Sequence, residues 1–296
     1  MSVVETQSLT KLYGKSRGIE SVDLCVDKGE VFGFLGPNGA GKTTTIRLLL
    51  NLIKPTSGEA RVFGLDSVKA SLAIRSRTGY LPGEPSLYPQ LTGRAWLNYM
   101  LSLRDQAWSP RITELARRLG AELNKPLKHA SKGMRQKVAL LGALAPAPEL
   151  LVLDEPTNGL DPLTQQVVYD ILAEERAAGT TIFLSSHILP EVERVCDRVA
   201  MIRSGQIALV ERVASLKARR VKTARATFRS PPERSQFNTP GLTASFAGLT
   251  AEFTIRGPLS AFLAVLAASG VESLVMEESK LEDVFLSLYE GEGTAR

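Results

Sequence analysis

Hydrophobic residues in this chain gather in short runs that alternate with amphipathic stretches. The runs at 31–35, 149–156 ("ELLVLDEP") and 180–187 ("TTIFLSSH") have the length and composition of buried strands. Apolar residues recur at helical spacing over 43–53 and over 162–179. Strands that alternate with helices favour a parallel sheet covered on both faces. The pattern therefore predicts an α/β fold.

The predicted helices and turns add detail to this fold. From about 91 to 144 the pattern is helical throughout, which predicts an inserted helical subdomain at about 84–150. The sequence around 204–205 ("Ser-Gly") predicts a hairpin. Within 162–179 a single stripe indicates one buried face, formed by Leu163, Val167, Ile171 and Leu172.

The character of the chain changes near residue 216. The segment "SLKARRVKTARATFR" is basic, and "RSPPERSQFNTPG" is rich in proline and polar residues. We therefore predict two domains, at 1–215 and 216–296. The second is expected to be a small α+β accessory domain, with strand-like segments at 223–230, 250–257 and 271–278 and helix-like segments at 259–269 and 281–291.

Composition narrows the class of protein. The 296 residues are 44% hydrophobic and 23% charged, and the net charge of +5 is mild for this length. Nucleic acid is therefore not expected as a partner unless the positive charges gather on one face. The sequence contains neither a signal-peptide pattern nor an apolar run of about 20 residues, so we expect a soluble chain that serves a membrane only through a partner. Cys25 and Cys196 lie in apolar segments and are predicted to be reduced core residues.

The strongest chemical signal is "GPNGAGKT" at 36–43, which fits G-x-x-x-x-G-K-[ST] in every fixed position. Its glycines let successive backbone N–H groups face one anion, and the helix that follows adds a partial positive charge. Lys42 is expected to contact the β- and γ-phosphates, and the Thr43 hydroxyl to bind Mg²⁺. The predicted nucleotide-binding residues of this loop are Gly36, Pro37, Asn38, Gly39, Ala40, Gly41, Lys42, Thr43 and Thr44.

Two carboxylates follow the apolar run at 150–153. Asp154 and Glu155 end a predicted strand, and the phosphate loop also follows a strand, so both can converge on one site. Asp154 is expected to hold Mg²⁺, directly or through water. Glu155 can polarise the water that attacks the γ-phosphate, a task for which GTPase switches use glutamine.

The segment "HASKGMRQKVALLGAL" at 129–144 places a glycine in the first turn of a predicted helix. Ser131 reads as its N-cap, because the hydroxyl can accept a hydrogen bond from an unpaired N–H of the first turn. Gly133 would cost up to about 1 kcal/mol against alanine, yet it would let an anion approach the bare helix N-terminus. The segment is therefore either a second phosphate site or a cap with a tolerated glycine.

Taken together, 36–43, "ASKGM", "LLVLDEP", "GLDP" and "LSSH" resemble the nucleotide-binding subunit of an ATP-binding cassette (ABC) transporter. The resemblance covers about residues 3–215, with the family's order and spacing of motifs. It implies a phosphate-loop NTPase cassette with a parallel-sheet core and an inserted helical subdomain. The C-terminal "LEDVFLSLYEG" is similar to the tail domain of exporter ATPases, including those for drug and antibiotic efflux.

The resemblance also implies roles for single residues. Tyr13 would stack on adenine, although an ordinary strand-end tyrosine is the alternative. Asp161 would reach across a dimer. The sequence alone predicts that Asp161 is the N-cap of a helix that begins at Pro162, and both interpretations can hold. His187 would contact the γ-phosphate and hold the attacking water and Glu155 in line; the alternative is a structural histidine. The signature segment would bind the γ-phosphate of ATP held by the opposite subunit, through Ser131, Lys132, Gly133 and Met134.

Two departures from the family pattern affect the predicted site. The signature, most often Leu-Ser-Gly-Gly-Gln, is "ASKGM" here, and it keeps the serine and the second glycine. The family's glutamine that senses Mg²⁺ and the attacking water falls at Gly83, which has no side chain to bind a metal. Glu84 is the nearest substitute, and a Gly-Pro turn is the alternative interpretation of this stretch.

We therefore expect the ATPase subunit of a membrane exporter for a drug or antibiotic. It would bind MgATP at a dimer interface, act with a separate transmembrane permease, and lie at the cytoplasmic face of the membrane. Its second cassette subunit would form a homodimer or a heterodimer with it. The alternative is a non-transport ABC ATPase that acts on nucleic acid or ribosomes, suggested by the basic residues Lys217, Arg219, Arg220, Lys222, Arg225 and Arg229.

Overall fold

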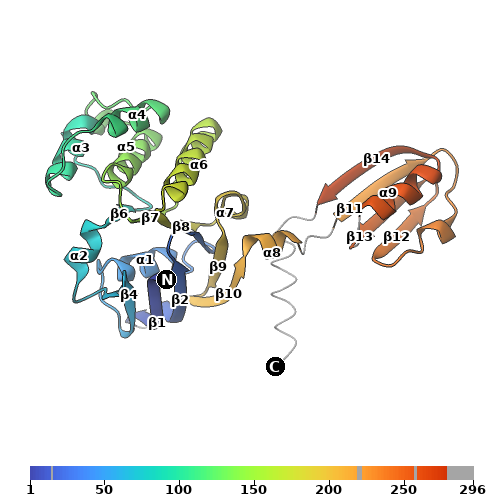
Figure 1. Ribbon diagram of the computed structural model, residues 1–296, viewed down its shortest axis with the longest axis horizontal. Coiled ribbons are helices and arrows are strands. Elements are labelled where there is room, and N and C mark those ends of the chain that lie inside the picture. Colours follow the sequence, from blue (N-terminus) through green and yellow to red (C-terminus); the bar gives the residue numbers. More distant parts are fainter. Residues whose placement is uncertain (15, 219–221, 257–258, 279–296) are drawn as a thin grey trace. The chain divides into compact units, whose positions relative to one another are not determined.

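The computed structural model describes residues 1–14, 16–218, 222–256 and 259–278 of the chain. It divides into two compact units, Met1–Val213 and Ala214–Arg296, each with its own hydrophobic core. The division falls near residue 216, where the composition of the sequence changes. Figure 1 shows the elements of both units.

A six-stranded sheet forms the centre of the first unit, with strands β3 (Val31–Leu35), β6 (Thr78–Leu81), β7 (Leu150–Asp154), β8 (Thr181–Ser186), β9 (Arg198–Arg203) and β10 (Gln206–Arg212). The strand order is β10-β9-β3-β8-β7-β6, and all pairs from β9 to β6 are parallel. Only β10 in this sheet is antiparallel, because it forms the hairpin with β9. The parallel sheet and the hairpin at 204–205 are thus confirmed.

A second sheet of four antiparallel strands also belongs to the first unit. It has the order β2-β1-β4-β5, with β1 (Ser2–Tyr13), β2 (Ser16–Asp27), β4 (Ser57–Val62) and β5 (Leu65–Asp66). The sequence analysis did not predict this sheet. The register between β1 and β2 shifts at several points, so the hydrophobic alternation of the two strands is interrupted.

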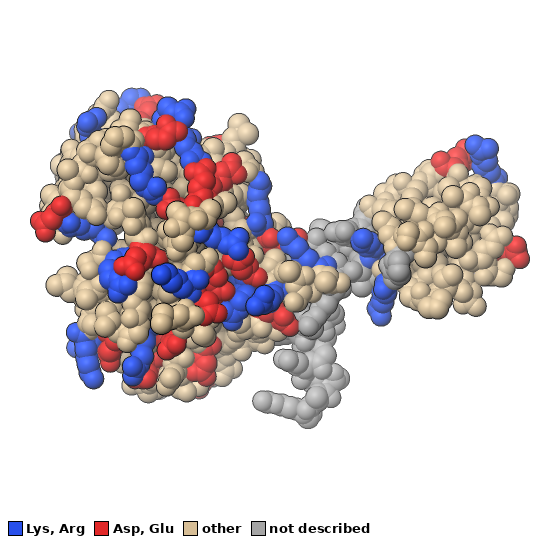
Figure 2. Space-filling model, viewed as in Figure 1, with Lys and Arg blue, Asp and Glu red and all other residues tan. Residues whose placement is uncertain are grey.

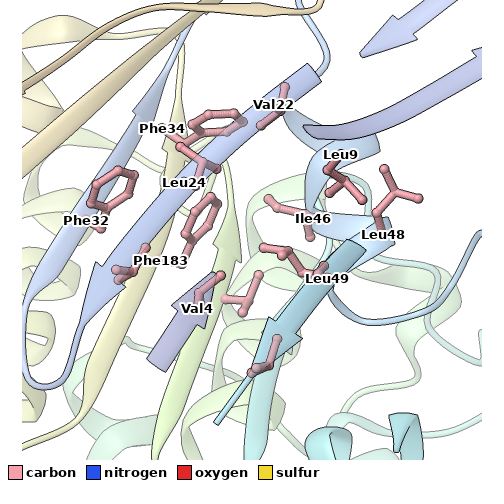
Figure 3. Packing of buried hydrophobic residues seen from close by; sticks show 14 of the residues in the cluster. Val4, Leu9, Val22, Leu24, Phe32, Phe34, Ile46, Leu48, Leu49 and Phe183 are labelled. Carbon is pink, nitrogen blue, oxygen red and sulfur yellow. The ribbon is translucent and has the colours of Figure 1, made fainter. Parts of the chain in front are cut away.

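The main core lies between the two sheets and includes helix α1 (Lys42–Leu49). Figure 3 shows Val4 and Leu9 of β1, Val22 and Leu24 of β2 and Ile46, Leu48 and Leu49 of α1 packed toward Phe32, Phe34 and Phe183 of the central sheet. The Phe32 and Phe183 rings are stacked with their centroids 5.9 Å apart. Burial of this apolar surface fixes α1, and with it the end of the phosphate loop, against the sheet.

The opposite face of the central sheet is covered by helix α7 (Leu189–Val195). A Cβ atom built on Gly33 of β3 would lie 2.8 Å from Cγ1 of Val192. The absence of a side chain at Gly33 therefore allows α7 to approach the strand closely. Helix α6 (Pro162–Ala177) packs against α7 and β8, so helices and the second sheet together cover both faces.

Two side-chain predictions for this unit are wrong. Leu163 is 82% exposed, and the buried stripe of α6 instead contains Thr164, Val168, Ile171 and Leu172. Leu163 stands in the first turn of α6, where it points away from the sheet side. Cys25 is exposed, because β2 alternates and its neighbours Leu24 and Val26 take the inward positions. Cys196 is buried, and both cysteines are free thiols.

The corrected stripe of α6 gives a stability prediction. Ile171→Ala is expected to lower the free energy of unfolding by about 2–5 kcal/mol, because it leaves a cavity in the core. Leu163→Ser is expected to change it by no more than about 0.5 kcal/mol, since the side chain lies in solvent. Urea unfolding of the two variants, followed by circular dichroism, measures both values; an equal loss of stability would contradict the observed packing.

The predicted helical subdomain begins after β6 and is helical from 93 to 144, with α3 (Gly93–Ser102), α4 (Pro110–Arg118), the 3₁₀ turn η1 (Leu127–His129) and α5 (Lys132–Leu144). Figure 1 shows α3, α4 and α5 grouped together, with α5 reaching toward β6. The last of these helices ends at Leu144, as the helical pattern at about 91–144 predicts, and Leu150 starts β7. A short helix, α2 (Ser71–Ser76), precedes β6.

The second unit is an α+β domain with a cluster of phenylalanines at its centre. Its antiparallel sheet has the order β12-β13-β11-β14, with β11 (Lys222–Phe228), β12 (Leu242–Ala247), β13 (Thr250–Ile255) and β14 (Val271–Glu278). The 3₁₀ turn η2 (Arg234–Phe237) stands between β11 and β12, and helix α9 (Leu259–Ala268) between β13 and β14. This connectivity matches a split βαβ arrangement with η2 in place of the first helix.

The predicted segments of this unit have mixed outcomes. The strands near 223–230, 250–257 and 271–278 and the helix near 259–269 are observed, and β12 is an additional strand. The helix predicted at 281–291 lies outside the described residues.

Helix α8 (Val213–Ala218) stands at the junction of the two units. Within the described ranges, every helix is too short or too polar to cross a bilayer.

Candidate nucleotide-binding site

The phosphate loop connects β3 to α1 and is held by its backbone. Gly41 is the residue before α1 and has φ 113°, in the left-handed region that favours glycine. A Cβ atom there would also lie 2.9 Å from the carbonyl oxygen of Gly18, so the position has no room for a side chain. The Ala40 N–H donates to Pro37 O at 3.1 Å. The loop is thus pre-formed around the N-terminus of α1.

Lys42 is buried and turns back over the loop. Its ammonium donates to Gly36 O at 2.6 Å and to Pro37 O at 3.2 Å, and it lies 3.4 Å from Oε1 of Glu155. These contacts place the positive charge at the mouth of the loop, as expected for a group that binds the outer phosphates.

Asp154 ends β7 and is 2% exposed. Its carboxylate accepts a hydrogen bond from the Thr43 hydroxyl at 2.7 Å and another from the Ser185 hydroxyl on the neighbouring strand β8. The two predicted Mg²⁺-binding residues are therefore in contact. Hydroxyl and carboxylate oxygens suit a hard cation such as Mg²⁺. Among the described residues no group of three or more His, Cys, Asp or Glu side chains gathers.

Glu155 follows in a strained backbone conformation. Its φ of 50° is unusual for a residue with a side chain, and its N–H donates to Ser185 O at 3.1 Å. Its Oε1 lies 3.1 Å from Nδ1 of His187, just beyond the end of β8. The structure thus brings Lys42, Glu155 and His187 together from three segments that are far apart in the sequence.

The signature segment begins α5, and Ser131 is its N-cap. The Ser131 hydroxyl accepts a hydrogen bond from the Met134 N–H at 3.1 Å, as predicted. Lys132 Nζ lies 3.4 Å from Oδ1 of Asn158. A Cβ atom built on Gly133 would lie 2.8 Å from the carbonyl oxygen of Gly159. Close packing against the 158–159 loop is therefore a reason for this glycine that the sequence analysis did not consider.

Asp161 caps α6, as the sequence predicted. Its carboxylate accepts hydrogen bonds from the Thr164 hydroxyl at 2.7 Å and from the Thr164 N–H at 2.9 Å. The hydroxyl and then the N–H of Thr164 lower the pKa of Asp161 below its ordinary value. The residue therefore stays charged at the N-terminus of α6, where a negative charge is favourable.

Tyr13 and the 83–84 segment lie at the edges of the site. Tyr13 ends β1 with an exposed ring, and the Lys11 ammonium lies 5.5 Å from its centroid. A Cβ atom on Gly83 would lie 3.3 Å from Oδ2 of Asp154, so this position is beside the predicted metal-binding carboxylate. The Glu84 side chain is exposed. A glycine at 83 leaves free space next to Asp154 where the family has glutamine.

Three polar residues of the site were missed by sequence reasoning. Ser185 contacts Asp154, and Gln136 and Glu191 contact the segment from Glu155 to Thr157. Ser185 could have been found from its place in "LSSH", directly before His187. Gln136 and Glu191 stand in helices α5 and α7, and only the fold reveals what they contact.

The phosphate loop and the side chains around it suit a nucleoside triphosphate with Mg²⁺. Its phosphates would meet the loop amides and Lys42, while Thr43 and Asp154 face the metal position and Glu155 can accept a proton from water. The fold and the site therefore define the class of phosphate-loop nucleoside triphosphatases.

Comparison with known proteins specifies the family. The ABC transporter family profile matches residues 19–158. The bacitracin transport ATP-binding protein BcrA of Bacillus licheniformis is 41% identical over 212 residues, which cover 70% of this chain and 68% of that protein. The daunorubicin/doxorubicin resistance ATP-binding protein DrrA of Streptomyces peucetius is 34% identical over 303 residues, covering 96% and 92%. The chain belongs to the ATP-binding subunits of ABC transporters.

The solved structures agree with this membership. An ATP-binding subunit of an ABC transporter superposes with a TM-score of 0.66 and 32% identity, covering 73% of this chain and 92% of that one. The chain is thus an ATPase subunit, and the transport role is favoured over the nucleic-acid alternative.

On the face shown in Figure 2, acidic and basic side chains are interspersed over the first unit.

Proposed function

We propose that this chain is the ATP-hydrolysing subunit of an exporter that removes a drug or antibiotic from the cell. The observation that carries this proposal is the similarity to the daunorubicin/doxorubicin resistance protein over 96% of the chain, which includes the second unit. The bacitracin transport protein adds a second relative whose name refers to an antibiotic. A hydrophobic drug is the cargo that we favour, and the membrane partner would select it.

The contacts of the site support a hydrolytic mechanism. The phosphate loop and Lys42 would bind the phosphates, and Thr43 and Asp154 would hold Mg²⁺, which would neutralise charge on the phosphates. Glu155 polarises the attacking water. His187, 3.1 Å from the Glu155 carboxylate, keeps that carboxylate turned toward the site.

A second cassette would complete the site. Ser131 and Gly133 stand at the N-terminus of α5, and the nucleotide contacts described above come from other segments. We infer that this N-terminus binds the γ-phosphate of ATP held by the partner subunit, with Asp161 at the same interface. A homodimer with two active sites is the simplest assembly, because the chain carries both halves of the interface; a heterodimer is the alternative.

The permease partner would dock on an apolar surface of the first unit. A cavity of about 290 Å³ lies among β6, the segment that follows it, α3 and α5. Its lining includes Leu52, Tyr80, Leu87, Trp96 and Met100. A cytoplasmic loop of the membrane partner would bury this surface, and the subunit would then lie at the cytoplasmic face of the membrane.

Co-expression with a candidate permease, a multi-span membrane protein found by inspecting the genes beside this one, tests the proposal. We expect the pair, but neither protein alone, to raise the resistance of a sensitive host to doxorubicin or to bacitracin, and to lower doxorubicin accumulation. The matched control is the pair with Glu155→Gln, which should give no resistance. Unchanged resistance to both compounds, in cells that contain both proteins, would contradict a role in drug or antibiotic export.

A further inference from the structure

Two buried polar side chains contact the turn that carries the catalytic carboxylate. This turn, from Glu155 to Thr157, connects β7 to the loop before α6. One contact comes from Gln136 in α5 and the other from Glu191 in α7. Both side chains lie in the interior, at 2% and 3% exposure, where an amide or a carboxylate is costly unless it is hydrogen-bonded.

Gln136 holds the main chain of the turn. Its amide nitrogen lies 3.3 Å from Glu155 O and 3.1 Å from Pro156 O, and it donates to both carbonyl groups. Because Glu155 has a φ of 50°, its backbone is in a conformation that must be stabilised by its surroundings. The two hydrogen bonds from one amide group provide such stabilisation at the residue that needs it.

Glu191 holds the other end of the turn and connects it to the histidine. It accepts a hydrogen bond from the Thr157 hydroxyl at 2.7 Å and one from the Ser186 hydroxyl at 2.5 Å. Ser186 directly precedes His187, so one carboxylate joins the chain on both sides of the Glu155–His187 contact. Burial raises the pKa of Glu191, while the two hydroxyl donors favour its charged form.

We propose that Gln136 and Glu191 are positioning residues that hold the Glu155 carboxylate in place for ATP hydrolysis, and we call them the Glu155 clamp. The proposal rests on the function proposed above, in which Glu155 polarises the attacking water. Neither clamp residue contacts the Glu155 carboxylate itself. They hold the chain at Glu155 and directly after it, and thereby the direction of the Glu155 side chain.

The clamp also connects the two ATP sites of a dimer. Gln136 lies on the same helix as Ser131 and one turn beyond Gly133, the residues inferred to bind the partner's nucleotide. A shift of the start of α5 on binding that nucleotide would move the Gln136 amide, and with it the carbonyl group of Glu155. Binding at one site would thus adjust the carboxylate of the other.

Substitutions that remove the polar groups but keep the length of the side chains test the clamp. Gln136→Met and Glu191→Met are expected to lower kcat about tenfold and to leave the KM for ATP within about twofold, because a small misplacement of a reacting group slows chemistry more than binding. Gln136→Glu should lower kcat further, since its carboxylate would face two carbonyl oxygens. Gln166→Met is the matched control: Gln166 lies on α6, contacts Arg194 and Asp170, and its change should leave kcat as it is.

A Glu155→Gln background separates the clamp from the proposed function. If the clamp acts through Glu155, Gln136→Met should reduce the residual turnover of this background by less than about twofold, because coupled residues are not additive. If Glu191→Met does not fold, the milder Glu191→Gln should still lower kcat. A normal kcat in Gln136→Met, with only its melting temperature lowered, would overturn the clamp. Failure of Glu155→Gln to dimerise with ATP would instead count against the proposed dimer.

Discussion

Glu155→Gln is expected to abolish steady-state ATP hydrolysis and to trap a dimer that forms only with ATP. Loss of a general base commonly slows a reaction by about 10²–10⁴-fold, and we expect turnover to fall by roughly 10³-fold. The glutamine has the size of the glutamate, so the contacts of Lys42 with the carbonyl groups of the phosphate loop remain. ATP should therefore bind normally and stay intact.

The trapped dimer follows from mass action. A nucleotide that is buried between two subunits stabilises their association for as long as it is not hydrolysed. Light scattering should report a monomer without nucleotide and a dimer with MgATP, and phosphate release should be close to background. The wild-type protein, measured beside it, should hydrolyse ATP with a rate per subunit that falls on dilution. A monomeric variant in both conditions, or full turnover by an isolated protomer, would contradict the shared site.

The parts of this site that could be predicted from the sequence are those with a local pattern. The phosphate loop, Asp154 and Glu155 each follow an apolar run, and Ser131 and Asp161 stand at helix starts, where the residue type itself indicates a cap. Although these segments are far apart in the sequence, the meeting of the phosphate loop with Asp154 and Glu155 could also be predicted, because parallel strands end at the same edge of a sheet.

The parts that could not be predicted depend on contacts between distant segments. The antiparallel sheet contains the strands β1 and β2, whose hydrophobic alternation is interrupted by register shifts. Strand β4 pairs with β1, but the phosphate loop and α1 lie between β2 and β4 in the sequence. Leu163 has the spacing of a buried residue, but in the first turn of α6 its neighbour Thr164 is buried and Leu163 is exposed. Gln136 reads as an ordinary helix residue, and its role becomes visible only when α5 lies against the Glu155 turn.

Gly133 is the residue for which the sequence and the structure give different reasons. The sequence suggests that a bare helix N-terminus admits an anion, whereas the structure shows that a Cβ atom would lie 2.8 Å from Gly159 O. The two reasons agree in one respect. The 158–159 loop leads directly to Asp161, so a side chain at Gly133 would displace the loop and obstruct the proposed interface at once.

Gly133→Ala is therefore expected to weaken nucleotide-dependent dimerisation while leaving ATP binding to the phosphate loop intact. The overpacking arises within the chain, and we expect the displaced 158–159 loop to cost the proposed interface about 1–3 kcal/mol. This corresponds to a loss of about one to two decades in association, so turnover should fall roughly 10–100-fold at a fixed concentration. In a Glu155→Gln background the variant should bind ATP in a filter assay and remain monomeric by light scattering. Ser131→Ala is the matched comparison, because it removes the cap hydroxyl without adding an atom near Gly159.

The comparison between these two variants separates packing from anion binding. If only the bare N–H groups matter, Ser131→Ala should weaken the dimer as much as Gly133→Ala does. If the contact with Gly159 dominates, Gly133→Ala should weaken the dimer more than Ser131→Ala does. A higher concentration of the Gly133→Ala protein should then restore part of the turnover, because it shifts the equilibrium toward the dimer. A Gly133→Ala variant that dimerises with the ATP dependence of its parent would show that the start of α5 has no part in the interface.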